Sequence, residues 1–438
     1  MRDIAVLVGV LAMLPPMFRH AHIGVLLWCW TAMIVPNNFL YGFGRSVPFN
    51  KLVAVLALLV WLLSREPKRI PVTSTVVLLF IFAALGTAST FTAIGDSETP
   101  WPQFENLMKT IVLCVAVLGL INTKSRIDAL LYTIALSLGF HGVAEGAKFL
   151  VSGGAHMVWG PSGSNITDNN HFALAMVAVL PIVLYLYKQA EHRLIKVALL
   201  GSSVLVIAAI MGTLSRGGLI GIVALGGFAF TRSKQKFRYV LAVIPLVVAA
   251  IAIAPERWFN RMDTIQTAEG DESFMQRVTA WKMSTLIAMD NPVLGGGFHS
   301  VAESPVWTKY ARNFNQLSFI PTPPPSTTRT HAAHSIYFQV LGDMGFVGLF
   351  VFLGILASSW RNATAVVRSA VNRPEWRWAS DLAITLQYSL VAYMVSGAGL
   401  SLAYFEYMYV VFALLVVLRK IVGEPTVQPR WAAPVGAG

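Results

Sequence analysis

Runs of apolar residues long enough to cross a lipid bilayer recur along almost the whole chain, and they constrain the fold more than any other feature. Hydrophobic residues make up 55% of the 438 positions and charged residues only 12%, which excludes an ordinary soluble class. A membrane helix needs about 20 mostly apolar residues. The candidate segments are 4–17, 22–36, 49–63, 70–92, 105–121, 127–150, 171–187, 196–213, 217–230, 239–254, 334–359, 381–399 and 404–420. We therefore predict an all-α polytopic membrane protein with about 12 transmembrane helices. The first segment is interrupted by Pro15 and Pro16, so the number is 12 or 13.

The formal net charge of +12 indicates membrane orientation rather than nucleic-acid binding. Basic residues gather in alternate gaps between the apolar segments, whereas the other short gaps carry very few. This asymmetry marks the cytoplasmic side of a membrane protein, so we expect the lipid bilayer as a partner and no nucleic acid. The basic gaps hold Arg65, Lys68 and Arg69; Lys124 and Arg126; Lys188, Arg193 and Lys196; Arg232, Lys234, Lys236 and Arg238; Arg361, Arg368, Arg373 and Arg377; and Arg419 with Lys420.

The same asymmetry divides the chain into four parts. We predict N-terminal transmembrane helices over 1–254, a large external loop over 255–333, C-terminal transmembrane helices over 334–420 and a short cytoplasmic tail over 421–438. Within the loop, Ser273 to Met289 predicts an amphipathic helix, with Ser273 as its N-cap and Asn291-Pro292 as its stop. One face of that helix would carry Phe274, Val278, Trp281 and Thr285.

His334 lies where the external loop meets an apolar helix that we expect to run to about Ser359. A neutral imidazole at this boundary is a candidate general base, although it could equally donate to a backbone carbonyl at the helix start. His331, three residues earlier, would allow a metal pair, but no acidic or cysteine partner is adjacent, so we predict no metal. Gly342, Gly345 and Gly348 further along the helix predict the close approach of a neighbouring helix.

Two arginines on the external side are candidate anion ligands. Arg216 is nearly the sole cation in its short gap, and its planar guanidinium can hold a phosphate in bidentate fashion; the alternative is an interfacial arginine that reaches the lipid headgroups. Arg277 lies one turn from Trp281 on the predicted amphipathic helix, where solvation is the alternative. Asn170, in the gap 153–170, adds a polar group that would bind sugar hydroxyls or belong to a solvated loop.

Three motifs in order along the chain resemble those of the O-antigen ligase and polymerase superfamily. Leu214-Ser215-Arg216-Gly217-Gly218 is similar to its serine–arginine–glycine signature, and His334-Ser335 followed by Gly345 and Gly348 is similar to the histidine motif of bacterial O-antigen ligases. Between them, Arg277, Trp281 and the block Asp290 to Phe298 resemble the arginine–tryptophan…aspartate–His–Pro block. Asn291 stands where that block often has histidine, so we assign it no catalytic role. The N-terminal half resembles O-glycosylation ligases associated with exosortase systems, which belong to the same superfamily.

The resemblance implies a GT-C-like membrane glycosyltransferase that needs neither a metal nor another cofactor. It would take a glycan from undecaprenyl diphosphate at the periplasmic face of the bacterial inner membrane and transfer it to a sugar hydroxyl of lipid A–core. His334 would be the general base, and Arg216 and Arg277 would hold the diphosphate. The further candidate substrate-binding residues are Ser215, Ser335, Trp281, His331 and Asn170.

Three other functions remain open. A repeat-unit polymerase for O-antigen or exopolysaccharide, or a protein O-oligosaccharyltransferase, would use the same lipid-linked donor with another acceptor. A transporter or flippase would also fit the hydropathy, but it would place charges near the membrane midplane. Glu145 and Lys148 are the one such hint, and a local ion pair near the outer helix end explains them as well.

Overall fold

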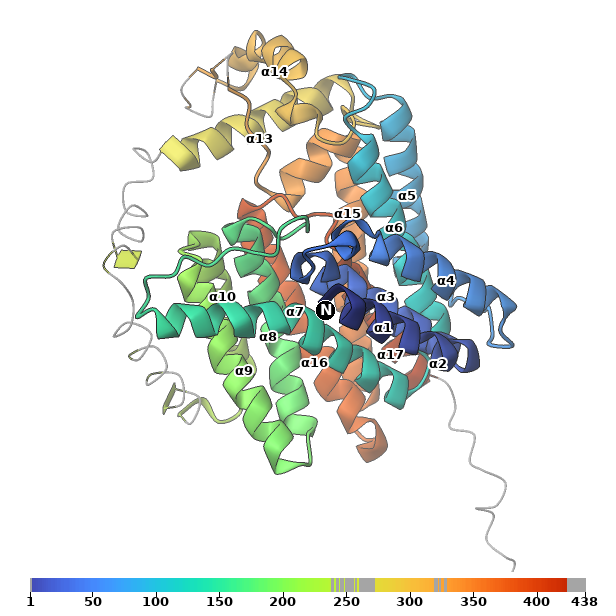
Figure 1. Cartoon of the computed structure of the whole chain (residues 1–438). Helices are drawn as coiled ribbons and strands as arrows, with labels where there is room; N and C mark the ends of the chain where they lie inside the picture. The colour runs from blue at the N-terminus through green and yellow to red at the C-terminus, as the bar shows by residue number, and fades with distance from the viewer. Residues whose placement is uncertain are drawn as a thin grey trace, which may run out of the picture.

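The computed structural model describes residues 2–237, 272–318 and 329–423, together with a few residues between these ranges. Every regular element in this part of the chain is a helix (Figure 1), as the apolar pattern predicts. The predicted apolar segment 239–254 lies almost entirely outside the described residues. So do most of 255–271 and all of the predicted tail beyond Gly423.

The first half of the chain forms seven α-helices with two short 3₁₀ turns. Pro15 and Pro16 occupy the first turn of α2, where a missing amide donor is tolerated, so the predicted first segment is divided into two short helices. The elements are α1 (Arg2–Ala12), α2 (Leu14–Arg19), α3 (Ala21–Ile34), η1 (Pro36–Phe39), η2 (Phe43–Ser46), α4 (Phe49–Leu63), α5 (Ser74–Phe91), α6 (Trp101–Leu120) and α7 (Lys124–Val151).

The second half supplies the centre of the bundle. α17 is apolar around its whole circumference, and its residues Tyr407 to Leu418 are all buried, as expected of a helix without a polar face. α8 is similarly enclosed. The elements are α8 (Asn169–Gln189), α9 (Arg193–Gly212), α10 (Arg216–Arg232), α13 (Glu272–Asp290), η3 (Ser300–Ala302), α14 (Ser304–Ala311), η4 (Phe314–Leu317), α15 (Ile336–Ser369), η5 (Pro374–Trp376), α16 (Arg377–Ser396), η6 (Gly397–Gly399) and α17 (Glu406–Gly423).

Seven helices in the described part of the chain are long and apolar enough to cross a membrane. They make the protein a polytopic helical membrane protein. Three further apolar stretches, Val6–Arg19, Ala21–Ile34 and Phe49–Leu63, are shorter. The expected total of 12 or 13 crossings therefore stays a prediction. The seven long spans lie within α5, α6, α7, α8, α9, α15 and the stretch Pro374–Gly399.

The described part of the segment predicted to form the external loop makes a small helical cap over one end of the bundle, above α15 (Figure 1). Its own core contains Ala280, Met283 and Ile287 of α13 packed with Trp307 and Tyr310 of α14. The predicted amphipathic helix is confirmed, and it ends at Asp290, before the predicted stop.

Two details of that helix differ from the prediction. α13 already begins at Glu272, so Ser273 lies inside the first turn and is not the N-cap. The face directed into the cap core also differs from the predicted one, because Phe274 is exposed and Trp281 is only half-buried. Small and flexible apolar side chains face the core of the cap, whereas the indole ring of Trp281 stacks on Phe338 of α15.

α15 and the loop that follows α13 are locked together by backbone hydrogen bonds. The amide nitrogens of Gly296 and Gly297 donate to the carbonyl oxygens of Gly342 (2.8 Å) and Asp343 (3.1 Å). Gly345 interrupts the helix with φ 69°, a conformation that favours glycine. A methyl group at Gly295 would lie 2.5 Å from the Gly345 nitrogen, so side chains cannot enter this contact, which we call the glycine interlock.

The glycine interlock changes part of the prediction for this helix. Close approach of a neighbouring helix is confirmed at Gly342, where a methyl group would lie 3.1 Å from Ser284 Oγ of α13. Gly345 instead breaks the helix, and a methyl group at Gly348 would meet the side chain of Met344 in α15 itself. Beyond the break α15 continues to Ser369 rather than ending near Ser359.

The two charged residues that suggested a transporter form a local cluster at the C-terminal end of α7. Glu145 accepts from Lys148 Nζ at 2.5 Å and from His156 Nε2 at 2.7 Å. The Lys148 side chain is 59% exposed. These contacts match the local explanation of the pair, so the hint of buried transport charges loses its basis.

Candidate functional site

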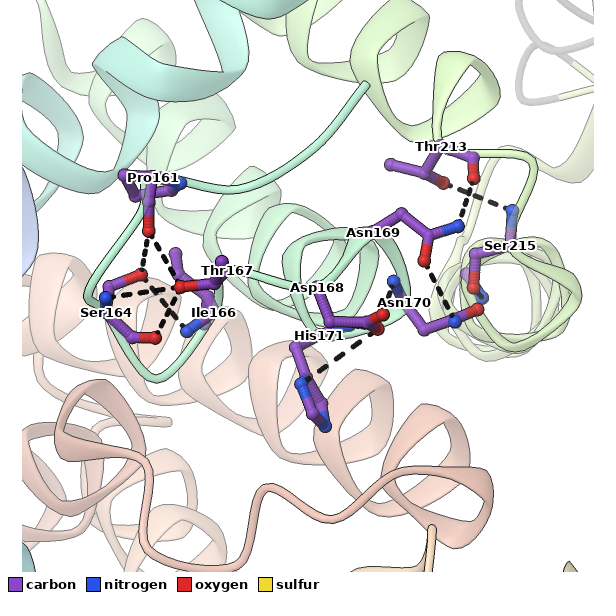
Figure 2. Close-up of polar contacts among 11 residues, drawn as sticks. Pro161, Ser164, Ile166, Thr167, Asp168, Asn169, Asn170, His171, Thr213 and Ser215 are labelled. Atoms are coloured by element: carbon purple, nitrogen blue, oxygen red, sulfur yellow. Dashed lines mark hydrogen bonds and ion pairs between the residues drawn. The ribbon is translucent and has the colours of Figure 1, made fainter. Parts of the chain in front are cut away.

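The N-terminus of α8 is joined to the turn between α9 and α10 by amide side chains (Figure 2). Asp168 caps α8 by accepting hydrogen bonds from the backbone nitrogens of Asn170 (2.8 Å) and His171 (3.3 Å). Asn169 Nδ2 donates to the carbonyl oxygen of Thr213 at 2.8 Å. Asn170 Nδ2 in turn donates to Asn169 Oδ1 at 3.1 Å. These bonds fix the polar start of α8 beside the turn that leads to Arg216.

The turn before Arg216 is held by its own residues. Leu214 adopts a left-handed conformation with φ 55°, and Ser215 N donates to Thr213 Oγ1 at 3.3 Å. Ser215 Oγ accepts from Gly218 N at 3.1 Å and so caps α10. Arg216 is the first residue of α10, where its charge adds to the positive end of the helix dipole. The electrostatic potential at this point favours an anion.

Trp281 of α13 contacts the chain on both sides of His334. The indole nitrogen of Trp281 donates to the carbonyl oxygen of Ala333 at 2.7 Å. The indole ring stacks on Phe338 of α15, with centroids 5.1 Å apart and planes at 7°. His334 itself has φ 44°, so the chain reverses sharply just before the helix starts. Trp281 therefore fixes the chain just before and just after His334.

Polar residues from several segments of the chain affect the pKa of His334. Burial lowers the pKa of His334 to about 4, and the positive charge of Arg277 acts in the same direction. Asp168 acts in the opposite direction. Asp168 lies at the start of α8, Arg277 in the first half of α13 and His334 at the start of α15, so these three segments contribute to one electrostatic environment. The imidazole is neutral at physiological pH.

A short turn that the sequence analysis did not single out connects these segments. It runs from Ser396 to Leu400 around η6. A methyl group at Gly399 would lie 3.4 Å from Arg277 Nη1, and one at Gly217 would lie 3.9 Å from both Ser396 O and Leu400 Cδ1.

A methyl group at Gly397 would lie 2.8 Å from Ile336 Cδ1, two residues after His334. The η6 turn thus touches the Arg216 turn, the Arg277 guanidinium and the start of α15. Its only sequence signals were two glycines flanked by serines at the end of an apolar run.

Three buried polar atoms around the start of α15 and the η6 turn make no hydrogen bond to any residue that the structure describes. They are Ser335 Oγ, His171 Nε2 and Ser396 Oγ. Ser335 is 1% exposed and stands at the N-cap position of α15, yet its hydroxyl forms no cap. Buried polar atoms are nearly always satisfied. These atoms therefore make this region a candidate site for a polar ligand.

The remaining candidates lie at the edge of the cluster. The ring of His331 packs edge-on against Trp307 of the cap, with centroids 5.7 Å apart. Over the residues described, no group of three or more His, Cys, Asp or Glu side chains is arranged to hold a metal ion. Ser215 and Trp281, predicted as substrate-binding residues, both have structural bonds, to Gly218 and Ala333 respectively.

The fold and this cluster define a polytopic membrane protein with an arginine- and histidine-rich site at one end of its helices. Residues 201–353 match the family described as O-Antigen ligase, and residues 1–191 match a family of unknown function. No curated protein matches the chain. The first match contains the Arg216, Arg277 and His334 motifs. The match over residues 201–353 supports the resemblance to the O-antigen ligase superfamily that those motifs predicted, and such a family implies a ligase or polymerase of glycans.

Proposed function

We propose that this protein is an O-antigen ligase. It transfers a glycan from undecaprenyl diphosphate to a sugar hydroxyl of lipid A–core at the periplasmic face of the bacterial inner membrane. The observation that carries the proposal is the position of His334. A neutral, half-buried imidazole lies within electrostatic reach of Arg277, and the η6 turn joins both to the Arg216 turn. All three belong to segments of the family match.

Orientation is part of the proposal. The basic residues Arg193, Arg232, Arg368 and Arg377 lie at the ends of α9, α10, α15 and α16 that are opposite to the site. Basic ends mark the cytoplasmic side, so the site faces the periplasm. Both substrates carry lipid tails, and a site at the end of the membrane helices is within reach of their headgroups.

The two arginines would hold the diphosphate. As the bond from the anomeric carbon to the diphosphate oxygen breaks, its electron pair leaves with the phosphate and the negative charge grows. Guanidinium groups fixed before the reaction stabilise that charge without reorganising. Arg216 adds its charge to the N-terminus of α10, and Arg277 lies against the η6 turn. Together they supply the positive charge that a metal ion supplies in other transferases.

His334 would act as the general base. Its imidazole takes the proton from the acceptor hydroxyl while the hydroxyl oxygen attacks the anomeric carbon, so a single displacement inverts the configuration. In the free protein the nearby charge of Arg277 helps to lower the pKa of His334 to about 4. A bound diphosphate offsets that positive charge and raises the pKa. The base is therefore strengthened when the donor is in place.

The other candidates divide into ligands and supports. Ser335 Oγ, buried and without a described partner, is suited to donate to a phosphate or sugar oxygen. Asn170, next to the cap of α8, and His331, at the edge of the cap, are positioned to contact sugar hydroxyls. Ser215 supports the position of Arg216, and Trp281 supports the position of His334. Any contact that either side chain makes with substrate is additional.

A reconstituted transfer assay tests the proposal. The purified protein in nanodiscs receives an undecaprenyl-diphosphate-linked glycan and, separately, lipid A–core, a Ser/Thr peptide or a second lipid-linked glycan. We expect product with lipid A–core only, unchanged in the presence of EDTA. Transfer to the peptide would reassign the protein as a protein O-oligosaccharyltransferase, and elongation of the lipid-linked glycan would reassign it as a polymerase. Dependence on a divalent ion would refute the metal-free mechanism.

A further inference from the structure

A polar cavity of about 370 Å³ lies between α3, α4, α6, the turn before α8 and the start of α17. Side-chain amides and a carboxylate dominate its polar lining. Its walls also include Trp28, Thr31 and Thr110. The amide and acid residues of the lining are Asn37, Asn50, Asn106, Asn165 and Glu406.

Three of these residues form a hydrogen-bonded relay. Asn106 Nδ2 donates to Asn165 Oδ1 at 2.8 Å, and Asn165 Nδ2 donates to Glu406 Oε2 at 2.9 Å. Asn50 Oδ1 is buried and makes no hydrogen bond to the described residues. The cavity thus offers oriented amide and carboxylate groups, one of which still lacks a partner. Such groups usually fix a ligand in a pocket.

The charges around the cavity largely cancel. Lys51 and Lys109, both in the lining, form ion pairs with the same carboxylate of Glu105, at 2.7 and 2.8 Å. The third charged residue of the lining is Glu406. A phosphate would need uncompensated cations, whereas a sugar ring needs amide and carboxylate groups for its hydroxyls and an aromatic wall. The lining therefore fits an uncharged polyhydroxylated ligand.

The turn that carries Asn165 is fixed in place. Ser164 Oγ and Thr167 Oγ1 both donate to the carbonyl oxygen of Pro161, at 2.6 and 3.0 Å (Figure 2). Asn38 Nδ2, from η1, donates to the carbonyl oxygen of Ser162 at 2.8 Å. A side chain presented by a rigid turn loses little conformational entropy when a ligand binds.

Only a short stretch of chain separates the cavity lining from the start of α8. Asn165 precedes Asp168 by three residues, so the two Cα atoms are at most about 11 Å apart. Asp168 caps α8 and contributes to the electrostatics of His334. We propose that this cavity is a carbohydrate subsite, which binds a sugar residue of the donor glycan or of the acceptor next to the reacting bond. The proposal rests on the proposed function and extends it to the recognition of the glycan.

Binding to a protein that cannot turn over tests the subsite. In a His334→Ala background, Asn106→Ala and Asn165→Ala are each compared with Asn315→Ala, an exposed control on η4. The probes are undecaprenyl-diphosphate-linked tetrasaccharide, undecaprenyl diphosphate alone and lipid A–core, each titrated against protein in nanodiscs. Thermal unfolding of every variant shows whether it is folded. Thr110→Trp, which fills the cavity and leaves the relay intact, is a second variant.

We expect Asn106→Ala and Asn165→Ala to bind one glycan-carrying probe about 3- to 10-fold more weakly, the size of one lost hydrogen bond. Undecaprenyl diphosphate alone should bind unchanged. A loss confined to the tetrasaccharide-linked donor assigns the subsite to the donor, and a loss confined to lipid A–core assigns it to the acceptor. Unchanged binding of both glycan probes in folded variants, Thr110→Trp included, overturns the subsite and leaves the transferase proposal standing. If the His334→Ala protein binds none of the three probes, both proposals fall.

Discussion

The Arg216 turn and the start of α15 at His334 meet at the same end of the bundle, but they are stabilised in different ways. The Arg216 turn is held by short-range bonds, with Ser215 capping its own helix and Thr213 bonded within the turn. The start of α15 is held by Trp281, 52 residues away from Ala333 in sequence, and its Ser335 hydroxyl is left without a described partner. The difference suits the proposed roles of the two regions: a completed local structure would present Arg216 to an anion, whereas the incomplete one would leave polar groups for substrate.

The largest difference between the two regions should appear when their reactive side chains are removed. His334→Ala eliminates the proposed base, so the transfer rate should fall by about 10²- to 10⁴-fold. The measurement is the initial rate in the reconstituted assay, with membrane insertion followed by fluorescence size-exclusion chromatography. The matched control is His192→Ala. His192 is exposed and lies at the N-terminal end of α9, opposite to the end that leads to the Arg216 turn. Near-normal product from His334→Ala would remove the general-base role.

Removal of either arginine should cost about 10²- to 10³-fold in rate, the usual effect of one preorganised donor. Arg216→Lys and Arg277→Lys should recover part of this loss, because lysine keeps the charge but lacks the planar fork. Exposed Arg312, in the cap, provides the control substitution to alanine. If Arg216→Ala retained full activity while Arg277→Ala lost it, the α10 turn would not be part of the diphosphate site.

The pH dependence distinguishes the two regions, because only the start of α15 titrates. The pKa of His334 is lowered from 6.5 to about 4, so the base stays neutral as pH falls, and kcat/KM should remain level down to about pH 5. Arg277→Gln removes a positive neighbour, which raises this pKa and moves the acid limb toward 6.5. An acid limb near 6.5 in the unmodified protein would show that His334 is not buried as the structure places it.

Trp281→Phe tests the long-range support with a smaller expected effect. Phenylalanine keeps the stacking on Phe338 but loses the hydrogen bond to the Ala333 carbonyl, which is worth about 1 kcal/mol. The expected result is a several-fold lower kcat with an unchanged KM for the lipid-linked donor. A change in KM alone would instead indicate that the indole contacts substrate directly.

The two serines at the helix starts give the smallest and most direct comparison. Ser215→Ala removes a cap and should lower the free energy of unfolding by about 1 kcal/mol. Ser335→Ala removes no cap, so the unfolding temperature should stay the same while substrate binding weakens. Thermal unfolding in nanodiscs measures the stability of both variants, and titration with the lipid-linked donor measures substrate binding. Equal destabilisation by the two substitutions would show that the Ser335 hydroxyl has a structural bond.

Local physics explains which parts of this structure were predictable. Among the described residues, the apolar runs gave most of the helices to within a few residues, because hydrophobic length fixes a membrane segment, but α15 extends ten residues beyond its expected end at Ser359. Arg216 and His334 stood out because ionisable side chains near membrane ends are costly unless they are used, and Arg277 stood out through its position one turn from Trp281. The resemblance to O-antigen ligases, carried by the motifs around these residues, was confirmed by the family match.

The remainder depends on contacts between distant residues. Asn165 and Glu406 are 241 positions apart, and neither belongs to a recognisable motif. The glycines of the η6 turn allow close packing, but small residues are common at helix contacts in membrane proteins. Their role could not be predicted before their neighbours were known. Gly345 predicted close packing but adopts a positive φ, a choice set by the facing Pro292 and Gly295 rather than by its own segment.

The glycine interlock has a practical consequence for the design of chimeras between this protein and other proteins that match the same family. Hydrogen bonds from Gly296 and Gly297 to α15 make the cap and the first turns of that helix one structural module. A chimera that transplants only the segment up to His334 would join mismatched halves of this contact. Crossover points placed before α13 and after Gly348 keep the transplanted module whole. They give the shortest graft that we expect to fold.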